Sequence, residues 1–444
     1  MPEYPEYWRK EIETMSRDKL KELQEKKFLK QLRYNLTNSL FYQEKFKQAG
    51  LELGDIKSLD DLAKIPFTSK DELRKSQEEV PPLGKHAACS MDKIIRIHSS
   101  SGTTGTPSYV GITRRDREMW TDIVARVHWS EGVRPNSRVI HGFGLSFFVG
   151  GLPIKDAIEE IGATFIPIGT GASDRLITTI KRVDADVLFC TPSYCLYLAE
   201  YARNRMKQDP RELGIKLICT GAEPGGGIPG VRKRMEEEWN CDVRESVGNA
   251  DAAPTFFAEC YYKTGNHEVA PDYVLTELID PDSGEVLEWA DDVEGEAVYT
   301  LIERECVPLL RFRTRDRFKV WTSACECGRT GYRVRCIGRT DDMLIVLGVN
   351  VFPSAIKDVV SNMRPNLTGD IQIVLDKPPP KVDPPLKVQV EYSSQVKDLD
   401  ALKKKAEAVL RDKLVAPIQL ELVPEGTLPR FEMKAKLIKK LYEE

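Results

Sequence analysis

SSSGTTGTP, at residues 99–107, follows the apolar run IIRI of residues 94–97 and has the composition of a loop that surrounds phosphate groups. Its two glycines let the backbone turn closely around an anion, while successive N–H groups and hydroxyls can donate hydrogen bonds to phosphate oxygens. The P-loop of nucleoside triphosphatases is excluded, because it needs four residues between its glycines and then Lys-Ser or Lys-Thr. A Ser/Thr/Gly surface linker is the alternative. Read as a phosphate loop, the segment predicts ATP chemistry, carried by Ser100, Ser101, Gly102, Thr103, Thr104 and Gly105.

Size and charge restrict the class of protein. A chain of 444 residues exceeds the size at which one hydrophobic core usually keeps growing, so two or more domains are expected. The 65 basic and 69 acidic residues are interspersed and give a net charge of −4, which argues against a nucleic-acid partner. The ten scattered cysteines and the absence of a leading basic and apolar segment indicate reduced thiols in the cytoplasm. No apolar run approaches the roughly 18 residues of a membrane span.

The central part of the chain alternates short β-rich runs with helical stretches, which indicates a parallel sheet covered by helices. The runs are residues 94–98, 138–142, 164–168, 187–190 and 217–220, and the helical stretches are 114–129, 174–183, 194–207 and 230–240. Before them, apolar residues at helical spacing from Leu20 to Leu40 predict amphipathic helices over residues 11–48. From residue 273 to 320, strands and a Pro-Asp-Ser-Gly turn at 281–284 favour antiparallel hairpins.

The composition changes again after residue 339. Residues 343–347 and 371–374 have the pattern of strands, residues 398–412 that of a helix, and the proline-rich residues 377–385 that of a loop. We therefore expect an α/β fold with a large N-terminal domain over residues 1–337 and a small C-terminal domain over residues 338–444.

Six further motifs follow the loop at residues 99–107. They are GAEP at 221–224, GNAD at 248–251, RFRTRD at 311–316, GRTDD at 338–342, GVNVFP at 348–353 and LPRFEMK at 428–434. In this order they resemble the adenylate-forming ligases, specifically the phenylacetate-CoA ligase branch, over about residues 7–441. The resemblance implies an adenylate-forming N-terminal domain with parallel-rich sheets and a small, mobile α+β C-terminal domain.

The nucleotide site implied by this resemblance draws on several motifs. Asp316 is acceptor-only when ionised, which suits the two ribose hydroxyls, although it could instead be a surface partner of Arg313 or Arg315. Asp251 aligns with the family's acidic residue that holds Mg²⁺, with a helix-capping aspartate as the alternative. In the family, the turn at residues 221–224 lies against the adenine, and the start of the motif at residues 248–251 belongs to the nucleotide site. Those residues are Gly221, Ala222, Glu223, Pro224, Gly248 and Asn249.

Lys434 aligns with the family's catalytic lysine, whose cation stabilises the charge that develops on the substrate carboxylate and the α-phosphate. A solvated helix face is the alternative, because lysines are abundant in this tail. Arg339 and Asp341 resemble the family's hinge between the two domains, and Arg339 also belongs to the expected nucleotide site. A salt-bridged turn is the competing interpretation of this pair.

Four residues have the spacing of a metal site. Cys260 and His267 are followed some sixty residues later by Cys325 and Cys327, and three thiolates with one imidazole suit tetrahedral structural zinc. Some members of this ligase branch carry such a site. Since the Cys-x-Cys pair is tighter than the usual zinc spacing, unrelated buried thiols are the alternative.

The acyl pocket is expected at residues 142–148, which match the family segment that lines an aromatic pocket. Phe143, Gly144, Phe147 and Phe148 offer flat apolar walls for an aryl ring, or are ordinary core residues. The sequence departs from the family at Thr106, often lysine, at Val247, usually tyrosine, at Asp251, usually glutamate, and at Met433, usually glycine.

These features predict an ATP-dependent ligase that joins an aromatic carboxylic acid, similar to phenylacetate or benzoate, to coenzyme A through an acyl-adenylate. The expected cofactors are ATP or AMP, Mg²⁺, coenzyme A and structural Zn²⁺. The expected partners are small molecules, and the sequence leaves open whether the protein forms a homodimer. A non-CoA acceptor (an amine, a carrier thiol or a deazaflavin-coenzyme hydroxyl) is one alternative. A nucleotide-binding protein without turnover is the other.

Overall fold

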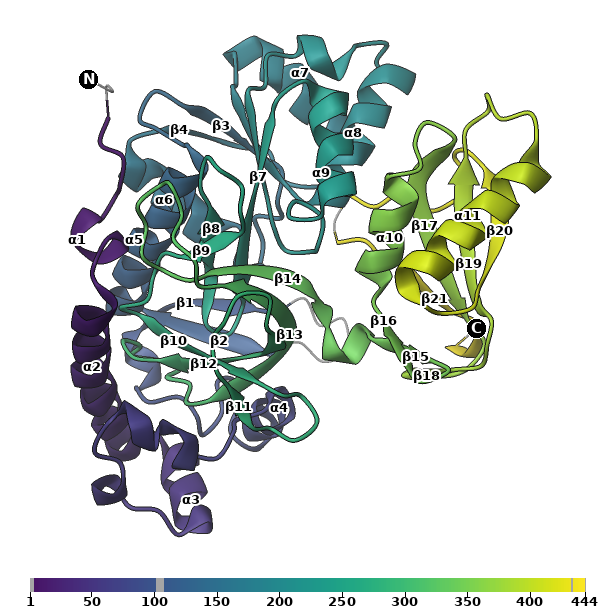
Figure 1. Cartoon of the computed structure of the whole chain (residues 1–444). Coiled ribbons are helices and arrows are strands. Elements are labelled where there is room, and N and C mark those ends of the chain that lie inside the picture. Colours follow the sequence, from purple (N-terminus) through teal and green to yellow (C-terminus); the bar gives the residue numbers. More distant parts are fainter. Residues whose placement is uncertain (1–3, 101–107, 433, 444) are drawn as a thin grey trace. The chain divides into compact units, whose positions relative to one another are not determined.

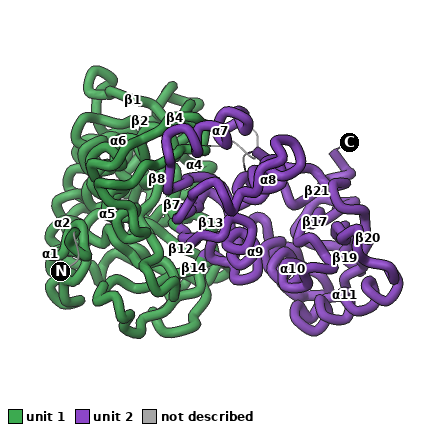
Figure 2. Tube along the Cα trace, turned by 90° about the horizontal axis from the view of Figure 1, so that it is seen from above, with its two compact units in different colours: residues 1–169, 246–335 green, residues 170–245, 336–444 purple. Residues whose placement is uncertain are grey.

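The computed structural model describes residues 4–100, 108–432 and 434–443 (Figure 1). The chain divides into two compact units, residues 1–169 with 246–335 and residues 170–245 with 336–444 (Figure 2). The last crossing between the units, at residues 335 and 336, lies close to the domain boundary expected at 337 and 338. Residues 170–245, expected in the N-terminal domain, group with residues 336–444.

The first unit combines helices with a mostly antiparallel sheet. Its helices are α1 (Lys10–Glu13), α2 (Arg17–Asn38), α3 (Leu40–Ala49), α4 (Lys70–Glu79), α5 (Arg114–Glu131) and α6 (Leu152–Ile161). Its strands are β1 (Ile94–Ser99), β2 (Tyr109–Thr113), β3 (Arg138–His141), β4 (Thr164–Pro167), β8 (Ala253–Glu259), β9 (Asn266–Glu268), β10 (Val274–Ile279), β11 (Val286–Leu287), β12 (Glu294–Leu301) and β13 (Phe312–Trp321). Two strands continue from one unit into the other along the chain: β7 (Asp242–Asn249) and β14 (Arg333–Arg339).

Strand pairing in this unit agrees with the expected hairpins after residue 273. The strand order is β11-β10-β12-β13-β14-β9-β8-β7, and β10 pairs antiparallel with both β11 and β12. Strands β3 and β4 pair in parallel, as expected. The expectation was wrong for residues 94–98, because β1 pairs antiparallel with β2. Residues 100–108 between them are too few for the crossover of a dozen or more residues that joins parallel strands.

The N-terminal helices pack against the first unit through one side. Phe28 and Leu32 of α2 and Phe46 of α3 belong to a buried cluster that also contains Leu275 and Leu310. Leu40, at the end of the apolar pattern read from the sequence, is 48% exposed. Leu29 and Leu36 also pack against this cluster, so the inward side of the helices combines aromatic residues with most of the leucine series.

The second unit contains short parallel strands with helices and a separate mixed sheet. Its helices are α7 (Ser173–Val183), α8 (Pro192–Asn204), α9 (Pro229–Trp239), α10 (Pro353–Ser361) and α11 (Leu399–Leu414). Its strands are β5 (Val187–Cys190), β6 (Leu217–Thr220), β15 (Leu344–Val346), β16 (Val349–Val351), β17 (Leu367–Leu375), β18 (Lys381–Val382), β19 (Leu386–Tyr392), β20 (Ile418–Pro424) and β21 (Ile438–Lys440). Within this unit β5 pairs in parallel with β6, and β6 with the start of β7.

Burial in the second unit follows the strand sequences. Every residue of β5 and β6 is buried, as expected for uninterrupted apolar strands of a parallel sheet. In β17, by contrast, buried and partly exposed residues alternate, so that one face of the sheet β20-β19-β17-β21 forms the core. Helices α10 and α11 cover that face (Figure 1).

Helix α11 ends at an unusual residue. Val415 follows the helix in the left-handed conformation, with φ of 53°, and its side chain is 73% exposed. Glycine is the common residue at such a position, because a β-branched side chain is strained there.

Replacing Val415 with glycine is expected to raise the free energy of unfolding by about 0.5–1 kcal/mol, since strain is relieved and little apolar burial is lost. Val415→Ala, which keeps a Cβ in the same conformation, is the matched control and should gain less. Urea unfolding of the two variants measures the difference, and a less stable glycine variant would contradict the account.

Candidate functional site

A tight turn between β7 and β8 carries Asp251. Gly248 makes this turn possible, because a Cβ at that position would lie 2.1 Å from the backbone oxygen of Pro254. The side-chain oxygen of Asn249 accepts a hydrogen bond from the Asp251 N–H at 3.0 Å. Asp251 therefore lies in a β-turn and caps no helix in the described part of the chain, so the helix-capping alternative is excluded.

The carboxylate of Asp251 is paired with a lysine that the sequence reasoning did not single out. Lys70 Nζ lies 2.7 Å from Asp251 Oδ1 and 2.5 Å from Oδ2, and it also donates to Ser108 Oγ at 2.5 Å. The two side chains are only 18% and 8% exposed. Because shielding from water strengthens such a pair, Lys70 holds Asp251 firmly in one orientation.

Local structure fixes Lys70 at the first residue of α4. Ser69 caps this helix, with its side chain accepting a hydrogen bond from the Glu72 N–H while Glu72 bonds back to Ser69. The preceding residue, Thr68, exchanges backbone hydrogen bonds with Arg311 and Arg313 at 2.9 Å each. A cation at a helix N-terminus is unfavourable unless it has another partner. A lysine directly after a capping serine was therefore the feature of the sequence that could have identified Lys70 as a site residue.

The two described ends of the expected phosphate loop meet beside this pair. Ser100 N donates to the Ser108 carbonyl at 2.9 Å, and Ser108 N donates to Ser100 Oγ at 3.1 Å. Ser108 Oγ also lies 3.3 Å from Asp251 Oδ1. The structure therefore brings Ser100, Asp251 and Lys70 together. Ser101, Gly102, Thr103, Thr104 and Gly105 lie outside the described residues.

A buried histidine lies in the electrostatic environment of the pair. Burial lowers the pKa of His86 to about 4, with Lys70 also lowering it and Asp251 opposing the shift. Its Nδ1 lies 3.0 Å from Ser76 Oγ. The imidazole is thus neutral at physiological pH and adds no charge to the site.

The expected acyl-pocket residues occupy different environments in the loop after β3. Phe143 is buried, Phe148 is partly buried with its ring 6.3 Å from that of Phe143, and Phe147 is 58% exposed. The ring of Phe147 makes an edge contact with Tyr109 at 6.4 Å. Gly144 is partly buried. Phe147 is therefore no ordinary core residue.

Asp316 lies on β13 and is partly buried, with its N–H donating to Thr314 Oγ1 at 2.9 Å. The neighbouring arginines have acidic partners elsewhere: Arg313 pairs with Glu296 at 2.9 Å and Arg315 with Asp71 at 3.1 Å. Asp316 and the Lys70–Asp251 pair both belong to the first unit.

The remaining expected residues belong to the second unit. Gly221, Ala222, Glu223 and Pro224 follow β6, and Ala222 adopts a positive φ of 72°. Arg339 forms a two-pronged ion pair with Asp341 at 2.8 and 2.9 Å. Lys434 is exposed. Within the same unit, Glu223 Oε2 accepts a hydrogen bond from the backbone N–H of Ala435 at 2.5 Å.

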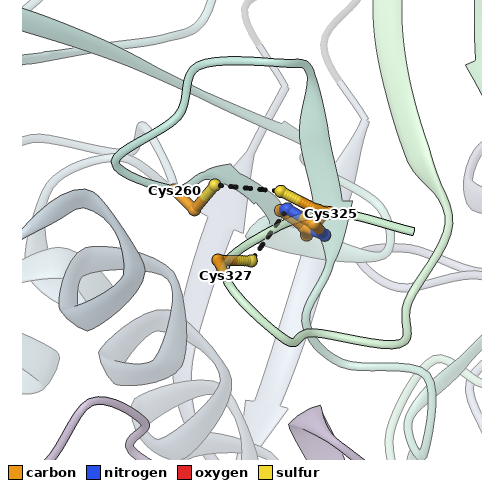
Figure 3. Close-up of side chains that lie close together, drawn as sticks. Cys260, Cys325 and Cys327 are labelled. Carbon is orange, nitrogen blue, oxygen red and sulfur yellow. Dashed lines mark hydrogen bonds between the residues drawn. The ribbon is translucent and has the colours of Figure 1, made fainter. Parts of the chain in front are cut away.

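The four metal-ligand candidates converge in the first unit. Their ligand atoms all lie within 4.8 Å of one another, and Figure 3 shows the three thiols directed toward one another. Cys260 Sγ lies 3.8 Å from Cys325 Sγ, and Cys327 Sγ lies 3.4 Å from His267 Nε2. Zinc–ligand bonds of about 2.0–2.3 Å place tetrahedral ligand atoms about 3.5–3.8 Å apart, so the donor set fits this metal.

Hydrogen bonds tie the loop of Cys327 to the N-terminal segment. Tyr7 Oη donates to the Cys327 carbonyl at 2.7 Å. Arg329 Nε pairs with Glu13 at 2.8 Å, with these side chains 4% and 0% exposed, and Thr330 N donates to the Glu13 carbonyl at 3.0 Å. The cysteine cluster is therefore part of a larger connected structure.

Comparisons with known proteins establish the family. Residues 348–440 match the model of the AMP-binding enzyme C-terminal domain. Phenylacetate-coenzyme A ligase of Thermus thermophilus is 33% identical over 439 residues, which cover 95% of this chain and 96% of that protein. The chain belongs to the phenylacetate-CoA ligase family. The Escherichia coli phenylacetate-coenzyme A ligase is also 33% identical, over 79% of this chain and 78% of its own.

Solved structures support the same assignment and confirm the predicted α/β class. A 2-hydroxyisobutyryl-CoA ligase in the postadenylation state, in complex with 2-HIB-AMP, has a TM-score of 0.93 and 28% identity, covering 100% of this chain and 94% of that one. The same ligase in the thioesterification state, with 2-HIB-AMP and CoA, has a TM-score of 0.73 and 29% identity, covering 99% and 93%. The chain is thus an adenylate-forming, ATP-dependent acyl-CoA ligase, as the resemblance implied.

None of the helices in the described ranges is both long and apolar enough to cross a membrane.

Substituting Lys70 with methionine is expected to slow acyl-adenylate formation by about tenfold to a hundredfold, because the shielded Asp251 carboxylate loses its cation. Acid-dependent pyrophosphate release measures the rate, and circular dichroism checks the fold. Lys75→Met, an exposed lysine on the same helix, should leave the rate unchanged. Wild-type activity in the Lys70 variant would show that the pair has no role in the reaction.

Proposed function

We propose that this ligase activates an aromatic carboxylic acid. In the first step the carboxylate oxygen attacks the α-phosphorus of ATP, and pyrophosphate leaves to give an acyl-adenylate. In the second step the sulfur of coenzyme A attacks the acyl carbon, the thiol proton is lost, and AMP leaves to give the thioester. The observation that supports the proposal is the Lys70–Asp251 pair beside Ser100 and Ser108, since a shielded cation and a carboxylate then lie next to the ends of the expected phosphate loop.

The residue roles follow the chemistry of each group. A carboxylate oxygen suits Mg²⁺, so Asp251 would contribute one ligand, and bound Mg²⁺ would offset phosphate charge. Asp316 accepts from the ribose hydroxyls, and the backbone of residues 221–224 contacts the adenine. Lys434 donates to the forming acyl-phosphate oxygens, where charge develops. Arg339 and Asp341 form the hinge that precedes the small domain.

The aromatic character of the acid rests on Phe143, Phe147 and Phe148. These rings follow β3, and the ring of Phe147 contacts Tyr109 of the β1–β2 hairpin, where Ser99 N donates to the Phe147 carbonyl at 3.0 Å. Phe147 is 58% exposed, so its ring has surface available for an aryl group. Phe147 therefore offers apolar surface next to the strand that leads into the expected phosphate loop.

The proposed activity is tested by pyrophosphate release from ATP and Mg²⁺ with a panel of aryl, arylacetic and aliphatic acids, each with and without coenzyme A. We expect the aromatic acids to give the highest kcat/KM, with thioester formed only when coenzyme A is present. Release without thioester would indicate another acceptor, and preference for an aliphatic acid would overturn the aromatic assignment.

Lys434→Ala is expected to reduce acyl-adenylate formation by about a hundredfold or more, since loss of one preorganised donor costs about 10²–10³ in rate. The exposed Lys436, changed to alanine, provides the control for loss of a nearby positive charge. Single-turnover measurement of the adenylate gives the rate, and full activity in the Lys434 variant would remove this residue from the mechanism.

We also propose that Cys260, His267, Cys325 and Cys327 hold a structural Zn²⁺. Three thiolates and one imidazole complete a tetrahedral set, with no position left for water, which is typical of structural rather than catalytic zinc. Hydrogen bonds from Cys260 and from His267 lower the pKa of Cys327, which favours the thiolate form that binds metal. The homodimer and the cytoplasmic location stay predictions.

Protein purified without chelator is expected to contain about one equivalent of zinc per chain, measured by inductively coupled plasma mass spectrometry. Cys327→Ser should lose the metal and lower the melting temperature, because the freed ligands remain crowded without a cation between them. Cys241→Ser, outside the cluster, is the control and should retain the metal. Zinc-free wild-type protein would exclude the site.

A further inference from the structure

The segment that carries Lys434 is held by acidic side chains. This segment is defined as residues 428–435, and the contacts described below, made by Leu428, Arg430 and Ala435, lie within the second unit. At its start, Arg430 donates to both oxygens of Glu391 at 2.8 and 2.9 Å and to Glu200 of α8 at 2.8 Å. At its end, the N–H of Ala435 donates to Glu223 Oε2 at 2.5 Å. Lys434 therefore lies between two anchored points.

The two anchors at Arg430 differ in kind. Glu391 is on β19 and has no exposed surface, and it also accepts the Leu428 N–H at 2.7 Å, so it fixes the segment to its own sheet. Glu200 is 38% exposed and belongs to α8. An exposed ion pair of this type contributes little to stability.

Glu223 makes a shorter and more specific contact. Its Oε1 accepts the N–H of Ser193 at 2.7 Å, while its Oε2 accepts the N–H of Ala435. Ser193 is in the first turn of α8, where backbone N–H groups lack helical partners and favour an anion. One carboxylate oxygen thus accepts a hydrogen bond from the N-terminus of α8, and the other accepts one from the residue next to Lys434.

We propose that Glu223 is a positioning residue for the catalytic lysine. Its bridge between the α8 N-terminus and the Ala435 N–H sets the backbone from which the Lys434 side chain extends, so that the ammonium group is ready for acyl-adenylate formation. The proposal rests on the role given above to Lys434. In this proposal the Glu223 side chain binds the protein's own C-terminal segment. The contact of the Gly221–Pro224 turn with the adenine is then made by the backbone of the turn.

A second role is available to Glu223 from the same geometry. As a cap of α8 it could stabilise the fold without any effect on Lys434. The two roles differ in their dependence on the lysine: a cap affects every variant equally, whereas a positioning residue has nothing to position once Lys434 is removed.

A double-mutant cycle separates these roles. We expect Glu223→Ala to slow acyl-adenylate formation about tenfold to a hundredfold, which corresponds to loss of one hydrogen bond to a charged group. In a Lys434→Ala background the same change should have no further effect. Single-turnover adenylate formation measures all four proteins, and Glu223→Gln, which keeps one acceptor oxygen and the side-chain shape, should fall between wild type and alanine.

The controls distinguish failure of this proposal from failure of the proposed function. Glu212→Ala removes an equally negative but exposed side chain from the same unit and should not change the rate. An equal loss from Glu223→Ala with and without Lys434 would overturn the positioning role, as would a wild-type rate in the single variant. A fully active Lys434→Ala protein would instead contradict the role of the lysine itself.

Discussion

The Lys70–Asp251 ion pair is the constraint on which the first unit's site depends. A lysine and an aspartate that are both largely shielded from water stabilise each other only while they stay in contact, because either charge alone would be costly to bury. Four separate pieces of chain keep them together: the N-terminus of α4, the turn after β7, the start of β2 and, through Thr68, the start of β13. Displacement of any one of these segments would therefore move Lys70 or Asp251 away from its partner beside the expected phosphate loop.

The sequence predicted those parts of the site that depend on short-range pattern. Asp251 and the cysteine–histidine cluster were found because motif and spacing identify them within a few residues, and the hairpins after residue 273 because turn and strand signals are local. Lys70 was missed, because it belongs to no motif and lies 181 residues from Asp251. The antiparallel β1–β2 pairing was missed for another reason. The alternation of strands and helices was interpreted as a single parallel sheet, although the connection between β1 and β2 is too short for parallel pairing.

Acidic side chains in the second unit have structural tasks that composition alone does not reveal. Glu223 and Ala435 are separated by 212 residues, so no local pattern connects them. Asp370 provides a related case: burial would raise its pKa, but Arg234 and Arg430 outweigh burial and lower the pKa to about 2. It therefore stays charged at any physiological pH and pairs with Arg234 of α9 at 3.0 Å.

The link between Glu13 and Arg329 joins the first turns of the chain to the loop that contains Cys325 and Cys327. This ion pair is almost fully buried, and Tyr7 donates a hydrogen bond to the Cys327 carbonyl. The segment from Tyr7 to Glu13 therefore holds the cysteine loop in place. Proteolytic trimming ahead of α2 would consequently remove more than a peripheral extension. It would leave the Arg329 guanidinium without its buried anion and loosen the backbone that presents two of the four sulfur and nitrogen donors. The segment from Tyr7 to Glu13 is in this sense part of the cysteine loop's structure, although most of the first unit's sequence separates the two.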